Sequence, residues 1–466
     1  MRKKILFVLG PIISSLFTFL SVPMSTWIFS KEEVGAYLLF ITLSNIGGTI
    51  LGLGLVQYFT REYFDFNDKI REFKKTLIPG IFISLLLFVI FGALRGDLIN
   101  HQLNMYFGGI STSIIFSSLA TLLTNNAFQY FRISGNDISF FISHILSRIS
   151  PLITLGLGFS GLIDCSLENL IFGYMVGQVV VMVFLLLRIR IFATSWSGLI
   201  LAHEWKSAFY FALPMFMTTI ISMIISSIDR FFIEKFLNLG DLGLYSVALT
   251  FGSAMGLLSQ IITTNWYPQV YKLLSNGKSH DTIVAINELI TYFLFSAFLF
   301  FTIASSVSSI FLPKNYFAVN NMVSMLLLNF VIISISDLGG LGLTIVRRPS
   351  IIMVISIITF VVTLIAGYIL IPRFGLLGVA LMNLLSGSIS LVLRVEFSRK
   401  YWIHFRRFRP YLILLISFFY SFSIWELKLS FVQLLILTGI VFIVFLKVFD
   451  LHKNVFFRLI KLKMWF

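Results

Sequence analysis

The sequence has 466 residues, of which 58% are hydrophobic and only 12% are charged, and its mean hydropathy is +0.95. This small number of polar side chains cannot cover the surface of a water-soluble protein of this length. The composition therefore excludes a soluble globular protein and indicates an integral membrane protein. Lys and Arg outnumber Asp and Glu by 35 to 20. In a membrane protein this excess belongs to cytoplasmic loops, and no basic soluble segment is long enough to bind nucleic acid.

Apolar stretches of about 20 residues, the length that crosses a bilayer, recur along the whole chain. The first follows Met1–Lys4 and is too long for a signal peptide, so we expect it to be a membrane span. The pattern predicts an all-α integral membrane protein with about fourteen transmembrane helices. Their expected ranges are 5–28, 36–57, 77–94, 106–127, 138–159, 168–187, 208–228, 242–264, 284–308, 319–340, 349–371, 375–393, 410–424 and 431–446.

The connections between these spans are short, and two of them divide the chain into larger parts. Residues 188–207 separate six spans from the next six, and WSGLILAHEWK within them is predicted to form an interfacial amphipathic helix. We therefore expect an N-terminal six-helix lobe at 1–190, a cytoplasmic linker at 191–207, and a second six-helix lobe at 208–396. Residues 397–466 add two transmembrane helices and a basic cytoplasmic tail.

A weak internal repeat supports the two lobes. Gly35–Tyr37 match Gly243–Tyr245 at an offset of 208 residues, and FGLLGVALMN at 374–383 is a weaker variant. The glycine permits a tight helix entry, and we expect the tyrosine to anchor the helix at the membrane interface, although both residue types are common there. Because the offset covers six spans, both copies have one orientation, which predicts a pseudo-two-fold axis along the membrane normal.

The distribution of basic residues predicts the orientation of the chain. With a cytoplasmic N-terminus, 27 of the 35 Lys and Arg residues fall on cytoplasmic segments and 7 on the outside, and the remaining one is Arg148 within a span. The positive-inside rule then places both termini in the cytoplasm. Reporter fusions after Leu274 and after Phe466 should both give a cytoplasmic signal. A periplasmic signal from the second fusion would show that one span has been miscounted.

Several features together resemble a known family. They are Pro214 early in the seventh span, Asp229 and Arg230 at its outer end, GLYS at 243–246, and SKEEVGAYLLF at 30–40. This combination is similar to the O-antigen and polysaccharide flippases of the multidrug, oligosaccharidyl-lipid and polysaccharide exporter superfamily.

That resemblance implies a fourteen-helix transporter of two six-helix lobes and two appended helices in the bacterial cytoplasmic (inner) membrane. Such a protein moves an undecaprenyl-pyrophosphate-linked oligosaccharide from the cytoplasmic to the periplasmic leaflet. The implied partners are this substrate and membrane lipids, together with a polysaccharide polymerase and a chain-length regulator.

The fifth span, 138–159, contains the most informative polar residues. Arg148 falls near its centre, where a cation costs about 3 kcal/mol and must face protein or water. His144 lies one turn earlier on the same helix face, and Pro151 leaves the carbonyl of Ser147 without its helical donor. We predict that Arg148 and His144 line a water-filled cavity between the lobes, where the arginine binds a pyrophosphate. The alternative is a buried pair that only holds helices together.

Other charged residues near the membrane faces are weaker candidates. Arg61 follows the second span, Arg132 the fourth, and Arg347 and Arg348 the tenth. Each could contact an anion, although the positive-inside rule already explains basic residues at these positions.

Four further charged residues are candidates for gating or ion coupling. Asp337 is followed by three glycines within five residues, which predicts a helix break of the kind that binds ions in transporters, and Glu288 lies early in the ninth span. Both are also within reach of headgroups. Asp229 and Arg230 are expected to form ion pairs between the lobes at the outer face.

The sequence contains no signature of an enzyme. Gly277–Ser279 resemble the end of a phosphate-binding loop, but Lys272 occupies the position of its first glycine. The single Cys165 excludes an intrachain disulfide and a cysteine metal cluster. We therefore expect no catalytic residues, metal or cofactor, and secondary transport driven by an H⁺ or Na⁺ gradient. The alternatives are a cation-coupled multidrug exporter of the same superfamily and, from another class, a membrane polysaccharide polymerase or ligase.

Overall fold

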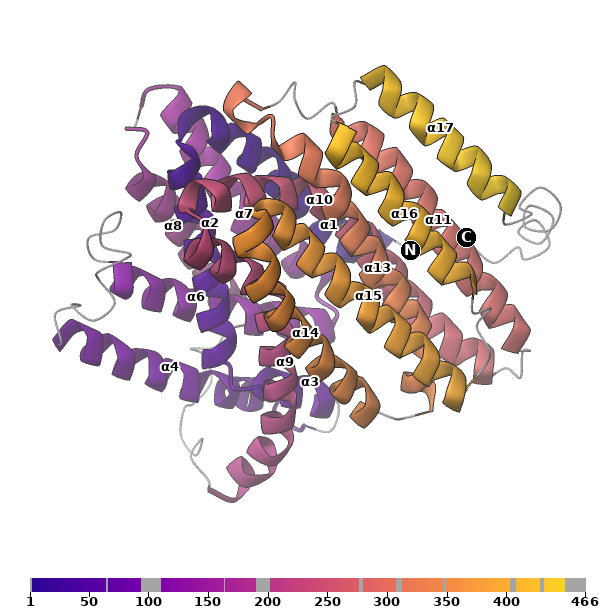
Figure 1. Cartoon of the computed structure of the whole chain (residues 1–466). Helices are drawn as coiled ribbons and strands as arrows, with labels where there is room; N and C mark the ends of the chain where they lie inside the picture. Colours follow the sequence, from indigo (N-terminus) through magenta and orange to yellow (C-terminus); the bar gives the residue numbers. More distant parts are fainter. Residues whose placement is uncertain are drawn as a thin grey trace. The chain divides into compact units, whose positions relative to one another are not determined.

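A computed structural model describes residues 2–63, 66–93, 110–162, 164–189, 202–275, 280–306, 312–346, 349–402, 408–427 and 431–448. These residues form fifteen α-helices and one 3-10 turn, with no strand among them (Figure 1). Each of the fourteen predicted spans overlaps a helix of the structure, and the second overlaps two, so the all-α prediction is confirmed. By length and composition, eleven helices of the described part can cross a membrane, and α17 contains a shorter apolar stretch, Val432–Phe445.

The chain divides into two compact units, one formed by Met1–Phe231 with Asn238–Gly243 and the other by Phe232–Leu237 with Leu244–Phe466. The predicted lobe boundaries at residues 190, 208 and 396 stay a prediction. The described helices of the first unit are α1 (Arg2–Ile28), α2 (Lys31–Leu51), α3 (Leu55–Glu62), α4 (Lys69–Ala93), α6 (Ile110–Ser134), α7 (Asp137–Phe159), α8 (Leu167–Ile189) and most of α9 (Ala202–Phe236). Those of the second unit are α10 (Leu239–Ser275) after its first turn, α11 (His280–Ser306), η2 (Lys314–Tyr316), α13 (Val319–Ile345), α14 (Pro349–Phe374), α15 (Leu376–Tyr401), α16 (Phe408–Leu427) and α17 (Phe431–Val448).

The order of helices repeats along the chain. Helices α2, α4, α6, α7 and α8 have counterparts in α10, α11, α13, α14 and α15. The first residues of these five pairs are offset by 208, 211, 209, 212 and 209 residues. The spacing of these five helix pairs agrees with the repeat predicted from two short turns, and α3 is an additional helix between the first two members of the first copy.

The first helix pair of this repeat begins in the same way in both copies. At α2, the N–H of Glu33 donates to Ser30 Oγ (3.2 Å), and the N–H of Ser30 donates to Glu33 Oε2 (2.9 Å). At α10, the N–H of Asp241 donates to Asn238 Oδ1 (2.8 Å), and Asn238 Nδ2 donates to Asp241 Oδ2 (2.7 Å). Both arrangements join the N-cap side chain to the third helical residue and fix where the helix starts.

The two repeat glycines pack against each other's helix within the first unit. A Cβ atom on Gly35 would lie 2.2 Å from the carbonyl oxygen of Leu239, and one on Gly243 would lie 2.2 Å from the carbonyl oxygen of Lys31. The contact is reciprocal, because Leu239 follows Lys31 by the same 208 residues that separate the glycines. Only glycine allows backbones to approach this closely. We call this contact the glycine crossing.

The second predicted span, 36–57, is wrong in its extent. The helix begins earlier, at Lys31, and ends at Leu51, after which a turn leads into α3. Gly54 in this turn has φ +70°, which favours glycine. A Cβ there would also lie 2.4 Å from the carbonyl oxygen of Ala212 in α9. The break therefore follows from the backbone conformation and from close packing, neither of which an apolar window records.

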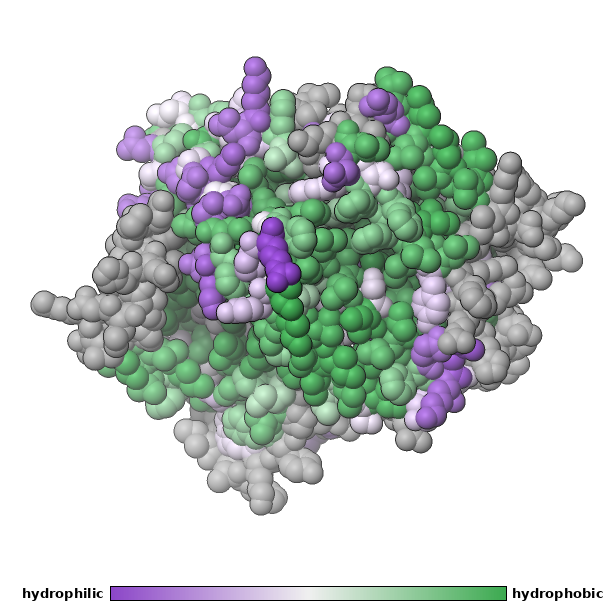
Figure 2. Space-filling view, viewed as in Figure 1, coloured by the Kyte–Doolittle hydropathy of each residue, from purple (hydrophilic) through white to green (hydrophobic). Residues whose placement is uncertain are grey.

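The exposed side chains of α14 show how the second unit meets the bilayer. They recur along the helix over 22 residues, which corresponds to about 31 Å and matches the hydrocarbon thickness of a membrane. Figure 2 shows the surface over α14 and α15, which is mostly hydrophobic. In water such a stripe would be unstable, and in lipid it is the expected surface. Its exposed residues are Met353, Val354, Ile357, Ile358, Val361, Ile365, Tyr368, Ile369 and Phe374.

Candidate functional site

Arg148 lies at the middle of α7, at the twelfth of its 23 positions. The helix begins at a side-chain cap, where the N–H of Ser139 donates to Asn136 Oδ1 (3.3 Å). Arg148 is therefore about 16 Å from the helix start, as expected for a residue near the bilayer centre. It is half-buried, and in the described part of the chain no ion pair or hydrogen bond joins it to another residue. An isolated cation at this depth costs at least about 3 kcal/mol.

Helices α7 and α8 approach each other closely next to this arginine. Ser150 Oγ donates a hydrogen bond to the carbonyl oxygen of Gly173 (2.6 Å). A Cβ on Gly173 would lie 2.0 Å from Thr154 Oγ1, and one on Gly177 would lie 2.6 Å from Ser150 Cβ. The two glycines form a GxxxG pattern, which permits such contact in membrane helices. Tyr174 lies between them and is buried in the first unit.

Two buried tyrosines share the surroundings of Arg148. Tyr37 on α2 and Tyr174 on α8 meet edge to face, with ring centroids 6.5 Å apart. Both phenols are within electrostatic reach of the Arg148 guanidinium, and the Tyr174 phenol also adjoins Thr121 of α6 and Gln178 of α8. We call these five residues the Arg148 cluster. Four helices of the first unit contribute to it, so the site is built within one compact unit.

The position of Tyr37 corrects the expectation that the repeat tyrosines anchor helices at the interface. Tyr37 is 7% exposed, and its counterpart Tyr245 is fully buried. Tyr245 has its own polar neighbour, since Asn383 Nδ2 donates to its hydroxyl (3.2 Å). Each tyrosine lies about two turns inside its helix and is enclosed by protein, so it does not contact lipid headgroups. The aromatic residue therefore marks a polar site in the interior of each repeat.

One face of α6 carries buried hydroxyl groups that make no hydrogen bond of good geometry. Ser117, Thr121 and Thr124 are at most 3% exposed, and their Oγ atoms have no such partner among the described residues. Hydroxyls in membrane helices usually donate to a carbonyl one turn earlier, as Thr42 does to Leu38 (2.8 Å). A buried hydroxyl without a partner costs about 1–3 kcal/mol. This face of α6, which includes Thr121 of the Arg148 cluster, is therefore suited to hold a polar ligand or water.

His144 lies on the same face of α7 as Arg148, within electrostatic reach of its charge. Its ring stacks on Phe128 with centroids 4.5 Å apart and 8° between the planes, and it meets Phe140 at 4.5 Å. The sequence predicted polar surroundings for His144, but the side chains that contact its ring are aromatic. A role for His144 in substrate binding stays a prediction.

Among the other four candidate cations, the structure describes one side chain, that of Arg132. Arg132 is exposed in the last turn of α6. Arg61 lies in the last turn of α3, and its side chain is outside the described part. Arg347 and Arg348 lie outside the described residues. Any contact of these four residues with an anion stays a prediction.

Asp337 has a counter-charge that sequence reasoning missed. Arg394 on α15 forms an ion pair and a hydrogen bond with its carboxylate. A signal was available, because both residues fall near the predicted cytoplasmic ends of neighbouring spans that run in one direction. Arg394 directly follows the predicted span 375–393 and was counted only among the basic residues on cytoplasmic segments.

The helix break predicted after Asp337 is wrong. Helix α13 continues to Ile345, and its glycines pack against α15. A Cβ on Gly339 would lie 2.6 Å from Val395, and one on Gly340 3.2 Å from Arg394. The glycines therefore bring the two helices together, where the sequence pattern indicated that they interrupt one.

The remaining acidic candidates lie inside helices. Asp229 and Arg230 were expected just beyond the predicted span 208–228, but α9 continues to Phe236. Asp229 is buried, and its Oδ1 accepts from the N–H of Arg230 (2.8 Å). Glu288 is half-buried in α11. Their roles in gating or coupling stay predictions.

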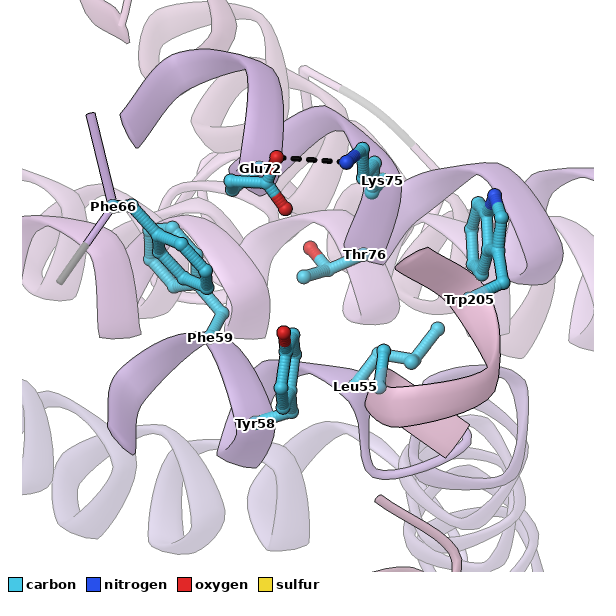
Figure 3. A pocket seen from close by; sticks show the side chains of 9 residues that line it. Leu55, Tyr58, Phe59, Phe66, Glu72, Lys75, Thr76 and Trp205 are labelled. Atoms are coloured by element: carbon cyan, nitrogen blue, oxygen red, sulfur yellow. Dashed lines mark hydrogen bonds and ion pairs between the residues drawn. The ribbon is translucent and has the colours of Figure 1, made fainter. Parts of the chain in front are cut away.

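A separate small pocket opens in the first unit between α3, the start of α4 and the start of α9 (Figure 3). Aromatic side chains including Tyr58, Phe66 and Trp205 line it, and it encloses about 310 Å³ including its open mouth. Its two charges neutralise each other, because Lys75 Nζ donates to Glu72 Oε1 (2.7 Å). This pocket lacks the uncompensated charge that distinguishes Arg148. Among the described residues no group of three His, Cys, Asp or Glu side chains could hold a metal.

Comparison with known proteins defines the class of this protein. No curated protein matches the sequence. The lipid II flippase MurJ in an inward closed conformation matches its fold with a TM-score of 0.70 at 16% identity, covering 96% of this chain and 100% of that one. An inward-facing multidrug resistance MATE family transporter of the MOP superfamily matches with a TM-score of 0.61 at 13% identity, over 88% and 98%. The chain is thus a multi-pass membrane protein with the fold of these transporters.

The family is shown by its sequence model. The model described as polysaccharide biosynthesis protein matches residues 1–274, which is more than half of the chain. The protein belongs to this family, and the resemblance found in the sequence is confirmed at that level. The matched region contains the whole Arg148 cluster.

Proposed function

We propose that this protein is a flippase that moves an undecaprenyl-pyrophosphate-linked oligosaccharide from the cytoplasmic to the periplasmic leaflet of the bacterial inner membrane. Transport proceeds by alternating access and supplies O-antigen or another surface polysaccharide. Membership of the polysaccharide biosynthesis family and the transporter fold support this proposal. A polysaccharide polymerase and a chain-length regulator would act on the product.

The single observation that carries the proposal is the unpaired charge of Arg148. A guanidinium presents planar, paired N–H donors that match the oxygens of a phosphate. In the described part of the chain no carboxylate neutralises it, so a doubly charged headgroup would supply the counter-charge while substrate is bound. The cost of placing this cation inside the membrane is then offset only when the substrate is present.

A cation-coupled multidrug exporter is the second candidate, because the fold also matches a MATE family transporter. An organic cation would be repelled by Arg148 unless a carboxylate lay between them. The Arg148 cluster contains hydroxyl, amide and guanidinium groups and no acid. Its charge therefore favours an anionic substrate.

Purified protein in lipid vesicles should flip a fluorescent polyprenyl-pyrophosphate-linked oligosaccharide without ATP, because the sequence contains no nucleotide site. The rate should fall at least tenfold when the H⁺ and Na⁺ gradients and the membrane potential are collapsed, since no other energy source is available. Loss of fluorescence to a membrane-impermeant quencher measures the flipped fraction. Candidates for the coupling step are Asp229, Arg230, Glu288 and Asp337.

Vesicles without protein, and vesicles given an organic cation as substrate, are the controls for this assay. Transport that requires ATP hydrolysis would contradict the secondary mechanism. Export of the cation with no movement of the lipid would favour the second candidate.

A further inference from the structure

The Arg148 cluster combines an uncompensated cation with groups that can donate hydrogen bonds. Tyr37 and Tyr174 present phenols, Thr121 a hydroxyl and Gln178 an amide, all from the first unit. Hydroxyl groups alone can bind either a cation or an anion, because each oxygen both donates and accepts. The sign of the nearby charge decides between them. Arg148 repels a cation and attracts an anion, towards which the hydroxyls turn their protons.

A second observation at the same place also indicates a ligand. Thr121 Oγ1 is buried and makes no hydrogen bond of good geometry to a described residue, although it adjoins the Tyr174 phenol. Ser117 and Thr124 lie four residues before and three residues after it on one face of α6, with the same property. Although Thr121 packs against Gly48 of α2, this packing gives none of the three hydroxyls a hydrogen bond of good geometry. All three are explained if this face contacts a group that accepts hydrogen bonds.

The counterpart of this site in the second unit is not charged. Helix α14 corresponds to α7 in the repeat, and it has no basic residue before Arg373 at its end. Tyr245, the counterpart of Tyr37, is hydrogen-bonded to Asn383. The repeat therefore provides the buried tyrosine twice, whereas the basic residue at the middle of α7 has no counterpart in α14.

We propose that Tyr174 and Thr121, together with Arg148, bind a phosphate-type oxyanion inside the first unit. This inference rests on the proposed function and names further contacts at the same site. Arg148 supplies the charge, and the two hydroxyls supply neutral donors from α8 and α6. Close packing through Gly173 and Gly177 holds Tyr174 in place, so the donors are fixed before the anion arrives.

The test measures binding of polyprenyl pyrophosphate, and separately of inorganic pyrophosphate, to the full-length protein in nanodiscs. Tyr174→Phe and Thr121→Val each remove one hydroxyl with little change of shape, and each should weaken polyprenyl pyrophosphate binding about tenfold. Tyr420→Phe is the matched control, because it removes a buried hydroxyl that bonds to Thr438 (2.7 Å) in the second unit; it should leave binding unchanged. Binding of neutral polyprenol should be equal in all variants, a readout that damage to the fold would lower.

The outcomes separate this inference from the function on which it rests. If Arg148→Ala weakens binding but Tyr174→Phe and Thr121→Val do not, the function stands and the two donors are wrong. If Arg148→Ala also has no effect, the anion site itself is wrong. If the variants lower only inorganic pyrophosphate binding, the cluster serves a free anion, and the assignment to the lipid headgroup is overturned.

Discussion

Replacing Arg148 with alanine should lower transport of the lipid-linked oligosaccharide by about 100-fold while the protein stays in the membrane. Hydrogen bonds to a charged group contribute about 1.5–3 kcal/mol each, and loss of about 2.7 kcal/mol corresponds to 100-fold. The fold should not weaken, because the substitution removes a cation that is costly to bury and has no protein partner in the described part. The measurement is the initial flipping rate in vesicles, normalised to the amount of inserted protein.

Arg148→Lys separates charge from geometry in the same assay. The ammonium keeps the charge but loses the planar pair of donors, so we expect a loss of about tenfold by the same conversion. Arg373→Ala is the control, because Arg373 is exposed at the end of α14 and belongs to no candidate site. Full transport by Arg148→Ala would refute the assignment. Loss of this variant from the membrane would show that Arg148 instead holds helices together.

Gly35→Ala and Gly243→Ala should each destabilise the protein by about 1–3 kcal/mol, the usual cost of overpacking. Each new methyl group would lie 2.2 Å from a backbone carbonyl oxygen, which cannot rotate away as a side chain can. The crossing helices must therefore separate by about 1 Å to restore an ordinary contact. The midpoint of thermal unfolding in detergent measures the effect, and it should fall by several degrees.

Gly439→Ala in α17 is the matched control, because nothing lies within 4 Å of the added Cβ. Alanine favours a helix more than glycine does, so this variant should be neutral or slightly more stable. Equal behaviour of all three variants would contradict the close contact at the glycine crossing. Substitution of both crossing glycines should cost less than the sum of the single changes, because the same two helices are separated only once.

Apolar windows predicted the positions of most of the long helices, eleven of which can cross a membrane in the described part, because the hydrocarbon thickness imposes one length on each span. The same windows could not locate the break at Gly54, which depends on a positive φ and on a contact with Ala212 far along the chain. The glycines after Asp337 show a related difficulty. Glycine permits either a helix break or close helix packing, and the neighbouring helix α15 decides between them.

The sequence identified only one residue of the Arg148 cluster, the arginine itself, because burying its charge costs the most free energy. A cation in the middle of an apolar span is conspicuous, so Arg148 was identified directly. Tyr174, Thr121 and Gln178 are ordinary residues in membrane helices, and only the packing of α6 and α8 against α7 makes them neighbours. For His144 the helical spacing was right, but the stacking on Phe128 could not be predicted, because it depends on how α6 lies against α7.

The ion pair between Asp337 and Arg394 has a consequence for biogenesis. The two residues lie on α13 and α15, and α14 is synthesised between them. A charged side chain entering the bilayer alone costs about 2.5–3.5 kcal/mol at the centre of a span and less towards its end, and pairing offsets part of this cost. Helix α15 can therefore reach its final depth more easily once α13 is already inserted, so three consecutive helices would enter the membrane as one cooperative group.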